Sequence, residues 1–316
     1  MPEIILVKNR SEIGAGTRGS SLAVSAIRMA SIKMQEHAFF HLPSVVVKNK
    51  NEWIEKECST PHALNIEKVL EVFKNIVETI TPVLQGNKFP LIISGDHSNA
   101  GGTIAAIRKA HPDKRIGLVW IDAHADLHSP FTTPSGNIHG MALAISLAED
   151  NLKNAINKPN AETLKYWHDL KLAGGVEPEI LPEDMVFVGL RSYEDAEADI
   201  IKKDNLRNYT MMEIVNRGVP EVGHEILDRL SNADLIYVSF DVDVMDLEIS
   251  QGTGTPVKDG LSQYQVIELI KILVASPKTI AFEAVEVNPL LDLKGNVMAE
   301  IALETLVEVM HIVEKR

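Results

Sequence analysis

The chain has a single cysteine and no long run of apolar residues. Cys58 alone can form neither an internal disulfide framework nor a zinc site with several cysteine ligands. No apolar run approaches the ~18 residues that a membrane-spanning helix needs, so we expect no membrane partner. The start, Met1-Pro2-Glu3, lacks the basic and then apolar pattern of a secretory signal, and a cytoplasmic location is therefore expected.

Positive charge is scarce as well. The sequence holds 31 Lys and Arg against 44 Asp and Glu, which gives a formal net charge of −13. Proteins that track the phosphates of nucleic acids normally show a basic face, so this balance argues against a nucleic-acid partner. It suits a small cationic ligand better.

Short apolar runs of strand length alternate along the chain with segments of helical period. This alternation predicts an α/β fold of three layers, αβα, with a mainly parallel central sheet. Because no linker, repeat or low-complexity tract interrupts it, we expect one domain over residues 1–316. The strand-like runs cover residues 4–7, 91–93, 116–121, 185–190, 235–240 and 280–285, and the clearest helical stripes cover residues 66–80, 266–273 and 301–312.

Acids and histidines follow three of these predicted strands. Asp122-Ala-His124-Ala-Asp126 comes directly after the strand at 116–121, and Asp241-Val-Asp243 follows the strand at 235–240. The strand at 91–93 is followed by Ser94-Gly-Asp96-His97. Residues two apart in an extended chain project to the same side. Since ligands of parallel sheets bind at the carboxyl ends of the strands, we expect these side chains to converge there.

Such a cluster needs a cation, because neighbouring carboxylates otherwise repel each other and raise each other's pKa. Four aspartates and two neutral imidazoles balance two divalent ions, which is typical of a two-metal centre. A donor set without thiolate favours manganese over zinc, so we expect two Mn²⁺ ions, with other first-row metals open. The predicted ligands are His97, Asp122, His124, Asp126, Asp241 and Asp243.

Together, the segments Ser94–Ser98, Asp122–Asp126 and Ser239–Asp243 resemble the three metal-binding motifs of the ureohydrolase superfamily, which contains arginase, agmatinase and formiminoglutamase. The resemblance implies an arginase-like fold and an assembly of three or six copies. It also implies that Asp122 and Asp241 bridge two ions, with His97 and Asp126 completing one ion and His124 and Asp243 the other. A hydroxide between the ions would then attack the substrate.

The loop Phe131–Gly140 makes arginase the most similar member, because it looks like the arginase loop that holds the α-carboxylate of the substrate. The resemblance implies hydrolysis of the guanidinium of L-arginine to L-ornithine and urea. It assigns carboxylate binding to Thr133, Ser135 and Asn137, proton transfer to Asp126 and His139, and pairing with the guanidinium to Glu286.

Four residues depart from the family pattern. Ser94 replaces a frequent Gly and Leu247 a frequent Pro, and both are interpreted as tolerated backbone changes. His128 stands where many arginases carry an Asn that contacts the carboxylate, and Glu194 replaces an Asp that meets the α-amino group. Both are expected to contact substrate, and the rest of the acidic run 194–199 is expected to be solvated helix surface.

Two alternatives therefore stay open. One is another ureohydrolase (a formiminoglutamase, guanidinobutyrase or agmatinase), and the other is a metal-binding relative without catalysis. The segment Gly14-Ala-Gly16-Thr-Arg-Gly19 matches a dinucleotide-binding fingerprint in its letters. Because it does not directly follow a predicted strand, we interpret it instead as a loop on the substrate side, ahead of a helix at 20–35.

Overall fold

The computed structural model describes residues 2–316 and contains one eight-stranded sheet. Its strand order is β2-β1-β3-β8-β7-β4-β5-β6, and every neighbouring pair is parallel. The strands are β1 (Ile4–Asn9), β2 (Ser44–Val47), β3 (Phe89–Ile93), β4 (Ile116–Ile121), β5 (Met185–Val188), β6 (Arg207–Tyr209), β7 (Leu235–Asp241) and β8 (Thr279–Val285).

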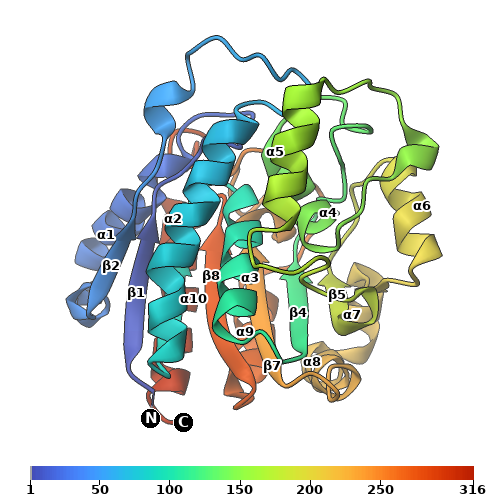
Figure 1. Cartoon of the computed structure of the whole chain (residues 1–316). Coiled ribbons are helices and arrows are strands. Elements are labelled where there is room, and N and C mark those ends of the chain that lie inside the picture. The colour runs from blue at the N-terminus through green and yellow to red at the C-terminus, as the bar shows by residue number, and fades with distance from the viewer. Residues whose placement is uncertain (1) are drawn as a thin grey trace.

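Helices cover both faces of this sheet, which confirms the three-layer prediction (Figure 1). One face carries α2 (Ile66–Gln85), α3 (Ser98–Ala110), α4 (Ala142–Ser146), α5 (Ala161–Lys171) and α6 (Asp195–Lys203). The other carries α1 (Ala23–Met34), α7 (Met211–Arg217), α8 (Val219–Arg229), α9 (Gln263–Ala275) and α10 (Val297–Val313). Short 3₁₀ helices lie at Ser20–Leu22, His37–His41, Asn51–Trp53, Ile138–Met141, Leu152–Asn154, Pro182–Asp184 and Val242–Val244.

The central strands are mainly apolar because both of their faces are buried. On β4, Leu118 and Trp120 pack into the core under α2 and α3. Their neighbours Val119 and Ile121 pack into the core on the opposite face. Such strands read as continuous apolar runs, which is why six of the eight could be predicted from sequence.

The two strands that sequence reasoning missed lie at the edges of the sheet. β2 is half exposed, with Val46 63% accessible, and β6 reads Arg-Asn-Tyr. An edge strand packs on fewer neighbours and carries a weaker apolar signal, so neither segment stands out by hydrophobicity. Within residues 2–316, no helix is long and apolar enough to cross a membrane.

The end of β3 touches the loop that follows β1, and this contact needs a glycine. A Cβ atom on Gly95 would lie 2.1 Å from the backbone oxygen of Ser11. Gly95 also accepts a hydrogen bond through its carbonyl from the backbone N–H of Glu286, 2.8 Å away, beyond the end of β8. One small residue thus lets three strand ends come together.

Replacing Gly95 by Ala should destabilise the protein by about 1–3 kcal/mol, because the backbone of the loop after β1 must move away. Gly140→Ala is the matched control, since a Cβ there meets nothing within 4 Å, and it should change the free energy of unfolding by less than about 0.5 kcal/mol. Urea unfolding of both variants measures the difference. Equal stabilities would contradict the packing argument.

Candidate active site

A pocket of about 240 Å³ lies at the carboxyl ends of the central strands. The ends of β3, β4 and β7 supply its acidic floor, and the loops that follow them supply its rim. Of the predicted site residues, all but Glu286 line it. Its walls are His97, Asp122, His124, Asp126, His128, Thr133, Pro134, Ser135, Asn137, His139, Gly140, Ser192, Glu194, Glu197, Asp241, Asp243 and Thr255.

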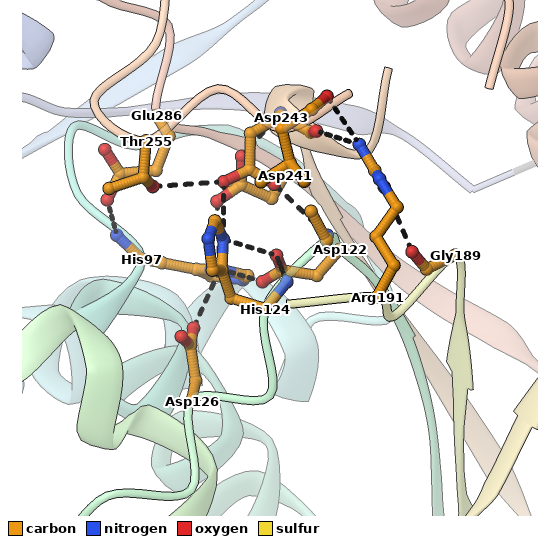
Figure 2. A network of polar contacts seen from close by, with 12 residues as sticks. His97, Asp122, His124, Asp126, Gly189, Arg191, Asp241, Asp243, Thr255 and Glu286 are labelled. Atoms are coloured by element: carbon orange, nitrogen blue, oxygen red, sulfur yellow. Dashed lines mark hydrogen bonds and ion pairs between the residues drawn. The ribbon is translucent and has the colours of Figure 1, made fainter. Parts of the chain in front are cut away.

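His97 lies at the centre of a first group of ligand-type atoms on the floor. Its Nδ1 is 2.9 Å from Asp122 Oδ2 and 3.2 Å from Asp126 Oδ2. Asp241 Oδ2 is also 3.2 Å from the same nitrogen. These four buried side chains come from three strand ends and point toward one another (Figure 2). They could hold one metal ion.

A second group forms around His124. The Nδ1 of His124 is 2.9 Å from Asp243 Oδ2 and 3.6 Å from Asp122 Oδ1. Asp122 therefore presents one oxygen to each group, as a bridging ligand of two ions would. The structure brings all six predicted ligands together in this way.

Hydrogen bonds from the local backbone fix the carboxylates. The N–H of His124 donates to Asp122 Oδ1 at 2.6 Å, and the N–H of Asp243 donates to Asp241 Oδ1 at 2.8 Å. The indole of Trp120 donates to the other oxygen of Asp122 at 3.0 Å. Asp122 and Asp241 therefore each have one orientation, set by hydrogen bonds from the strand end that carries them.

Two of the acids sit on a left-handed backbone. Asp126 has φ 51° and Glu286 has φ 64°, a region that costs a non-glycine residue of order 1 kcal/mol or more. The extended chain expected for 122–126 thus ends at Asp126, whose carbonyl accepts hydrogen bonds from Leu143 and Ala144 at the start of α4. Strain of this kind is common where a side chain must point in one direction for function.

The charges on the floor are poorly balanced without a cation. Burial, together with Asp243 and Asp122, raises the pKa of Asp241 well above its usual value. Burial and Asp122 likewise raise the pKa of Asp243 to about 6. Burial opposes the charged form of His97, but the contacts with Asp122, Asp126 and Asp241 outweigh it and raise the pKa of His97 well above the usual range.

Two atoms of the first group are also left without a hydrogen bond. Among residues 2–316, His97 Nδ1 and Asp126 Oδ2 are buried and have no hydrogen-bond partner. Unpartnered buried polar atoms are rare and call for a ligand or ion. The residues present therefore fit a pair of divalent cations.

The predicted carboxylate-binding loop lies on the rim. Thr133 Oγ1 accepts hydrogen bonds from the backbone N–H groups of Ser135 (3.3 Å) and Gly136 (2.9 Å). Ser135 Oγ accepts one from the N–H of Asn137 at 3.2 Å. Since both oxygens act as acceptors toward the backbone, each hydroxyl proton remains free to donate to an anion in the pocket.

His128 and Glu194 meet each other on the rim. His128 Nε2 is 2.8 Å from Glu194 Oε2, and its Nδ1 is 3.2 Å from Thr132 Oγ1. The imidazole that was expected to contact a substrate carboxylate is thus paired with a protein carboxylate.

Glu197 lies beneath this pair and was missed from sequence, because the run 194–199 was predicted to be solvated. The side chain of Glu197 is buried and accepts hydrogen bonds from the backbone N–H groups of Glu194 (3.0 Å) and Leu127 (3.1 Å). It forms a capping box with Glu194 at the start of α6. The spacing of three residues between Glu194 and Glu197 is that of a capping box, and this was the sequence signal that could have predicted the contact.

His139 and Glu286 form a further pair. His139 Nδ1 is 3.2 Å from Glu286 Oε1, which also accepts a hydrogen bond from the N–H of His97 at 2.9 Å. Glu286 lies behind His139 and is not on the pocket wall. The carbonyl of Gly14 accepts a hydrogen bond from the N–H of His139 at 3.1 Å, so the loop expected on the substrate side packs against the backbone of a pocket residue.

Sequence reasoning also missed two residues that hold the loop after β7. Thr255 donates from Oγ1 to Asp243 Oδ2 at 3.3 Å. Arg191 donates to the carbonyl oxygens of Gly189, Asp243 and Lys258, at 3.0, 3.1 and 2.8 Å (Figure 2). The guanidinium thereby ties the ends of β5 and β7 together beside the acids.

In the metal-free protein, His139 should titrate far above an ordinary histidine. Burial favours the neutral ring, but the hydrogen bond and charge of Glu286 outweigh it and raise the pKa of His139 to about 9. An NMR titration in EDTA, assigned with His139→Asn, should show this midpoint. In Glu286→Gln, the pKa of His139 should fall, since the hydrogen bond and charge of Glu286 are lost and only Asp126 and Asp96 still favour the charged ring. An unchanged midpoint would show that Glu286 does not hold the proton.

Glu197 should make the protein less stable as the pH rises. Burial and the neighbouring Glu194 raise the pKa of Glu197 to about 9 from 4.5. Between these values the folded state keeps a proton that the unfolded state has released, so stability falls with increasing pH. Glu197→Gln should therefore gain about 1 kcal/mol or more at pH 8 and little at pH 5.

Denaturant unfolding at both pH values measures this gain. The exposed Glu268 on α9 provides the control, since Glu268→Gln removes no buried carboxyl group. A gain that is the same at pH 5 and pH 8 would rule out the titration of Glu197 as its cause.

Comparisons of the chain with known proteins agree on one family. Residues 3–312 match the Arginase family. The chain is 35% identical over 288 residues to an arginase of Bacillus subtilis, covering 90% of each protein. Among solved structures, it is similar to the arginase of Bacillus caldovelox, with a TM-score of 0.83, 31% identity and 98% of each chain covered.

A more distant arginase shares the same architecture. The Entamoeba histolytica arginase, solved in complex with L-ornithine, has a TM-score of 0.81 at 25% identity and covers the whole of both chains. The fold, the clustered acids and histidines and the full-length match agree. The chain therefore belongs to the Arginase family and is a ureohydrolase, a hydrolase that acts on amidine C–N bonds.

Proposed function

We propose that this protein is an arginase that hydrolyses L-arginine to L-ornithine and urea with two Mn²⁺ ions. The observation that carries the proposal is the layout of the pocket. Ligand-type acids and histidines form its floor, and free hydroxyl donors lie on its rim at Thr133 and Ser135. A molecule with a cationic group at one end and a carboxylate at the other matches the floor and the rim of the pocket.

The family implies a pair of divalent metal ions, and the floor fits them. His97 and Asp126 would complete one ion and His124 and Asp243 the other, with Asp122 and Asp241 shared. When bound, the ions supply an activated water at neutral pH. A donor set of carboxylates and imidazoles without thiolate supports manganese.

The guanidinium end would be held by Glu286. Its Oε1 is engaged by His139 and by the backbone of His97, whereas Oε2 makes no hydrogen bond to residues 2–316. That free oxygen can accept from a guanidinium N–H once the His139 ring shifts toward the rim. Fixing the plane of the guanidinium presents its carbon to the floor and makes attack by water an oriented step.

The departing amine of ornithine needs a proton. Asp126 is placed on the floor to accept one from the attacking water. His139 holds its Nδ1 proton toward Glu286 and lies on the pocket wall, so its Nε2 can deliver a proton to the amine. Asp126 would then hold the proton taken from water and His139 would lack the one it gave, so exchange with solvent would restore both groups.

The amino-acid end involves the two residues that depart from the family pattern. Glu194 now accepts from His128, and both would exchange partners when substrate binds. Glu194 would turn to the α-amino group, and the Nε2–H of His128 would become free for the α-carboxylate. The α-amino group and the α-carboxylate of the substrate would together replace the hydrogen bond between His128 and Glu194.

The same pair supports the rival proposal of another ureohydrolase. Because His128 and Glu194 satisfy each other, the rim also accepts a substrate that lacks the α-amino group, such as 4-guanidinobutyrate. A metal-binding protein without catalysis is favoured by no feature of the pocket. A cytoplasmic location and an assembly of three or six copies stay predictions from the sequence.

The test is urea release after incubation with Mn²⁺, with L-arginine, agmatine and 4-guanidinobutyrate in parallel and formamide or ammonia release from formiminoglutamate. We expect kcat/KM for L-arginine to exceed that for agmatine at least about 100-fold, because agmatine leaves the hydroxyl donors of the rim without their carboxylate. Glu286→Gln should lower kcat at least about 100-fold. A preference for another compound would reassign the substrate.

A further inference from the structure

We propose that a buried chain of hydrogen bonds, running from Ser94 and Glu283 through Tyr237 and Ser239, sets the tautomer of His97 for metal binding. Glu283 and Tyr237 would be positioning residues that act through His97 without touching metal or substrate. The inference rests on the proposed function, because it concerns the metal site.

Strand register places these side chains on one face of the sheet. Glu283 on β8 has Ser239 on β7 as its register partner on one side. On the other side, its register partner is Ile92 on β3. Tyr237 lies two residues before Ser239, and Ser94 lies two residues after Ile92. Residues two apart in a strand project to the same face, so all four side chains gather under α3.

Glu283 is the fixed end of the chain. It is fully buried, and each of its carboxylate oxygens receives one hydroxyl donor. Ser94 Oγ donates to Oε1, and the Tyr237 hydroxyl donates to Oε2 at 2.5 Å. A carboxylate can only accept, so the Tyr237 proton must point toward Glu283.

The direction of every later hydrogen bond follows. With its proton committed, the Tyr237 oxygen can only accept, and the hydroxyls of Ser239 and Thr103 are the neighbours that can donate to it. Ser239 Oγ lies 2.9 Å from His97 Nε2, and a Ser239 hydroxyl that donates to Tyr237 accepts there. His97 therefore carries its proton on Nε2.

The consequence appears on the other side of the imidazole. A neutral ring protonated at Nε2 has a bare lone pair on Nδ1, the atom that faces Asp122, Asp126 and Asp241. Stacking on Trp120, with ring centroids 4.0 Å apart, fixes the ring plane but does not choose the tautomer. The hydrogen-bond chain makes that choice, as partners behind metal-bound histidines commonly do.

Ser94 gains a role in this arrangement. It was interpreted as a tolerated backbone change because many family members have Gly there. The structure instead places its hydroxyl on Glu283, in a position where a glycine has no donor. Without Ser94, one oxygen of a fully buried carboxylate would lose its hydrogen bond, which is costly in such a site.

Binding of Mn²⁺ alone tests the proposal in Tyr237→Phe, which removes only the hydroxyl. Free Mn²⁺ is measured by EPR on EDTA-stripped protein. We expect one of the two sites to weaken about 10–100-fold while the other keeps its affinity. Glu283→Gln should weaken the same site. Tyr209→Phe is the matched control, because Tyr209 is another fully buried tyrosine whose hydroxyl donates to a glutamate, Glu225, at 3.1 Å.

The outcomes separate the two proposals. If the native protein binds no pair of Mn²⁺ ions, the proposed function fails. If the native protein binds two Mn²⁺ ions and Tyr237→Phe binds them equally well, the proposal that the hydrogen-bond chain positions His97 is overturned. Melting in EDTA shows whether a variant is folded before metal is added. Should Tyr237→Phe not fold, Ser94→Ala decides by the same titration, with a weakened site supporting the chain and unchanged affinity overturning it.

Discussion

Repulsion among four buried aspartates is the constraint on which the rest of this site depends. Asp122, Asp126, Asp241 and Asp243 are each at most 7% exposed and lie around two histidines. Without a cation, burial and mutual repulsion raise the pKa of Asp241 well above its usual value. Such a cluster persists only where a rigid scaffold imposes it. The parallel sheet does so, because the ends of β4 and β7 deliver the acids, and local backbone N–H groups hold the carboxylates of Asp122 and Asp241 in one direction.

The scaffold also explains why the loops around the pocket are held so firmly. Arg191 donates to carbonyl oxygens in the segments that follow β5 and β7 and makes no ion pair with the aspartates beside it. It therefore supports their position without neutralising their charge. Gly95 similarly allows three strand ends to meet, and the loop at Gly14 contacts the backbone of His139. Each contact fixes a direction and leaves the charge of the floor available to cations.

Sequence reasoning recovered the central sheet and brought the right acids to its edge, because strands buried on both faces and acids at spacing two are strong signals. It missed β2 and β6, where edge exposure weakens the apolar pattern. It also missed the burial of Glu197, since a glutamate in an acidic run looks solvated unless its capping role is considered. The pairing of His128 with Glu194 could not be predicted, because it depends on the relative placement of two loops 66 residues apart in the chain.

The left-handed backbone at Asp126 and Glu286 has a consequence for how this protein can change over time. A glycine at either position would relax the backbone, and at Asp126 the loss of the buried carboxyl group would also remove repulsion with Asp122. A substitution of Asp126 that would abolish the proposed activity can therefore leave a fold as robust as the original. An inactive descendant of this sequence would be recognised by its missing acids, while its expression level and melting temperature would stay close to those of the active protein.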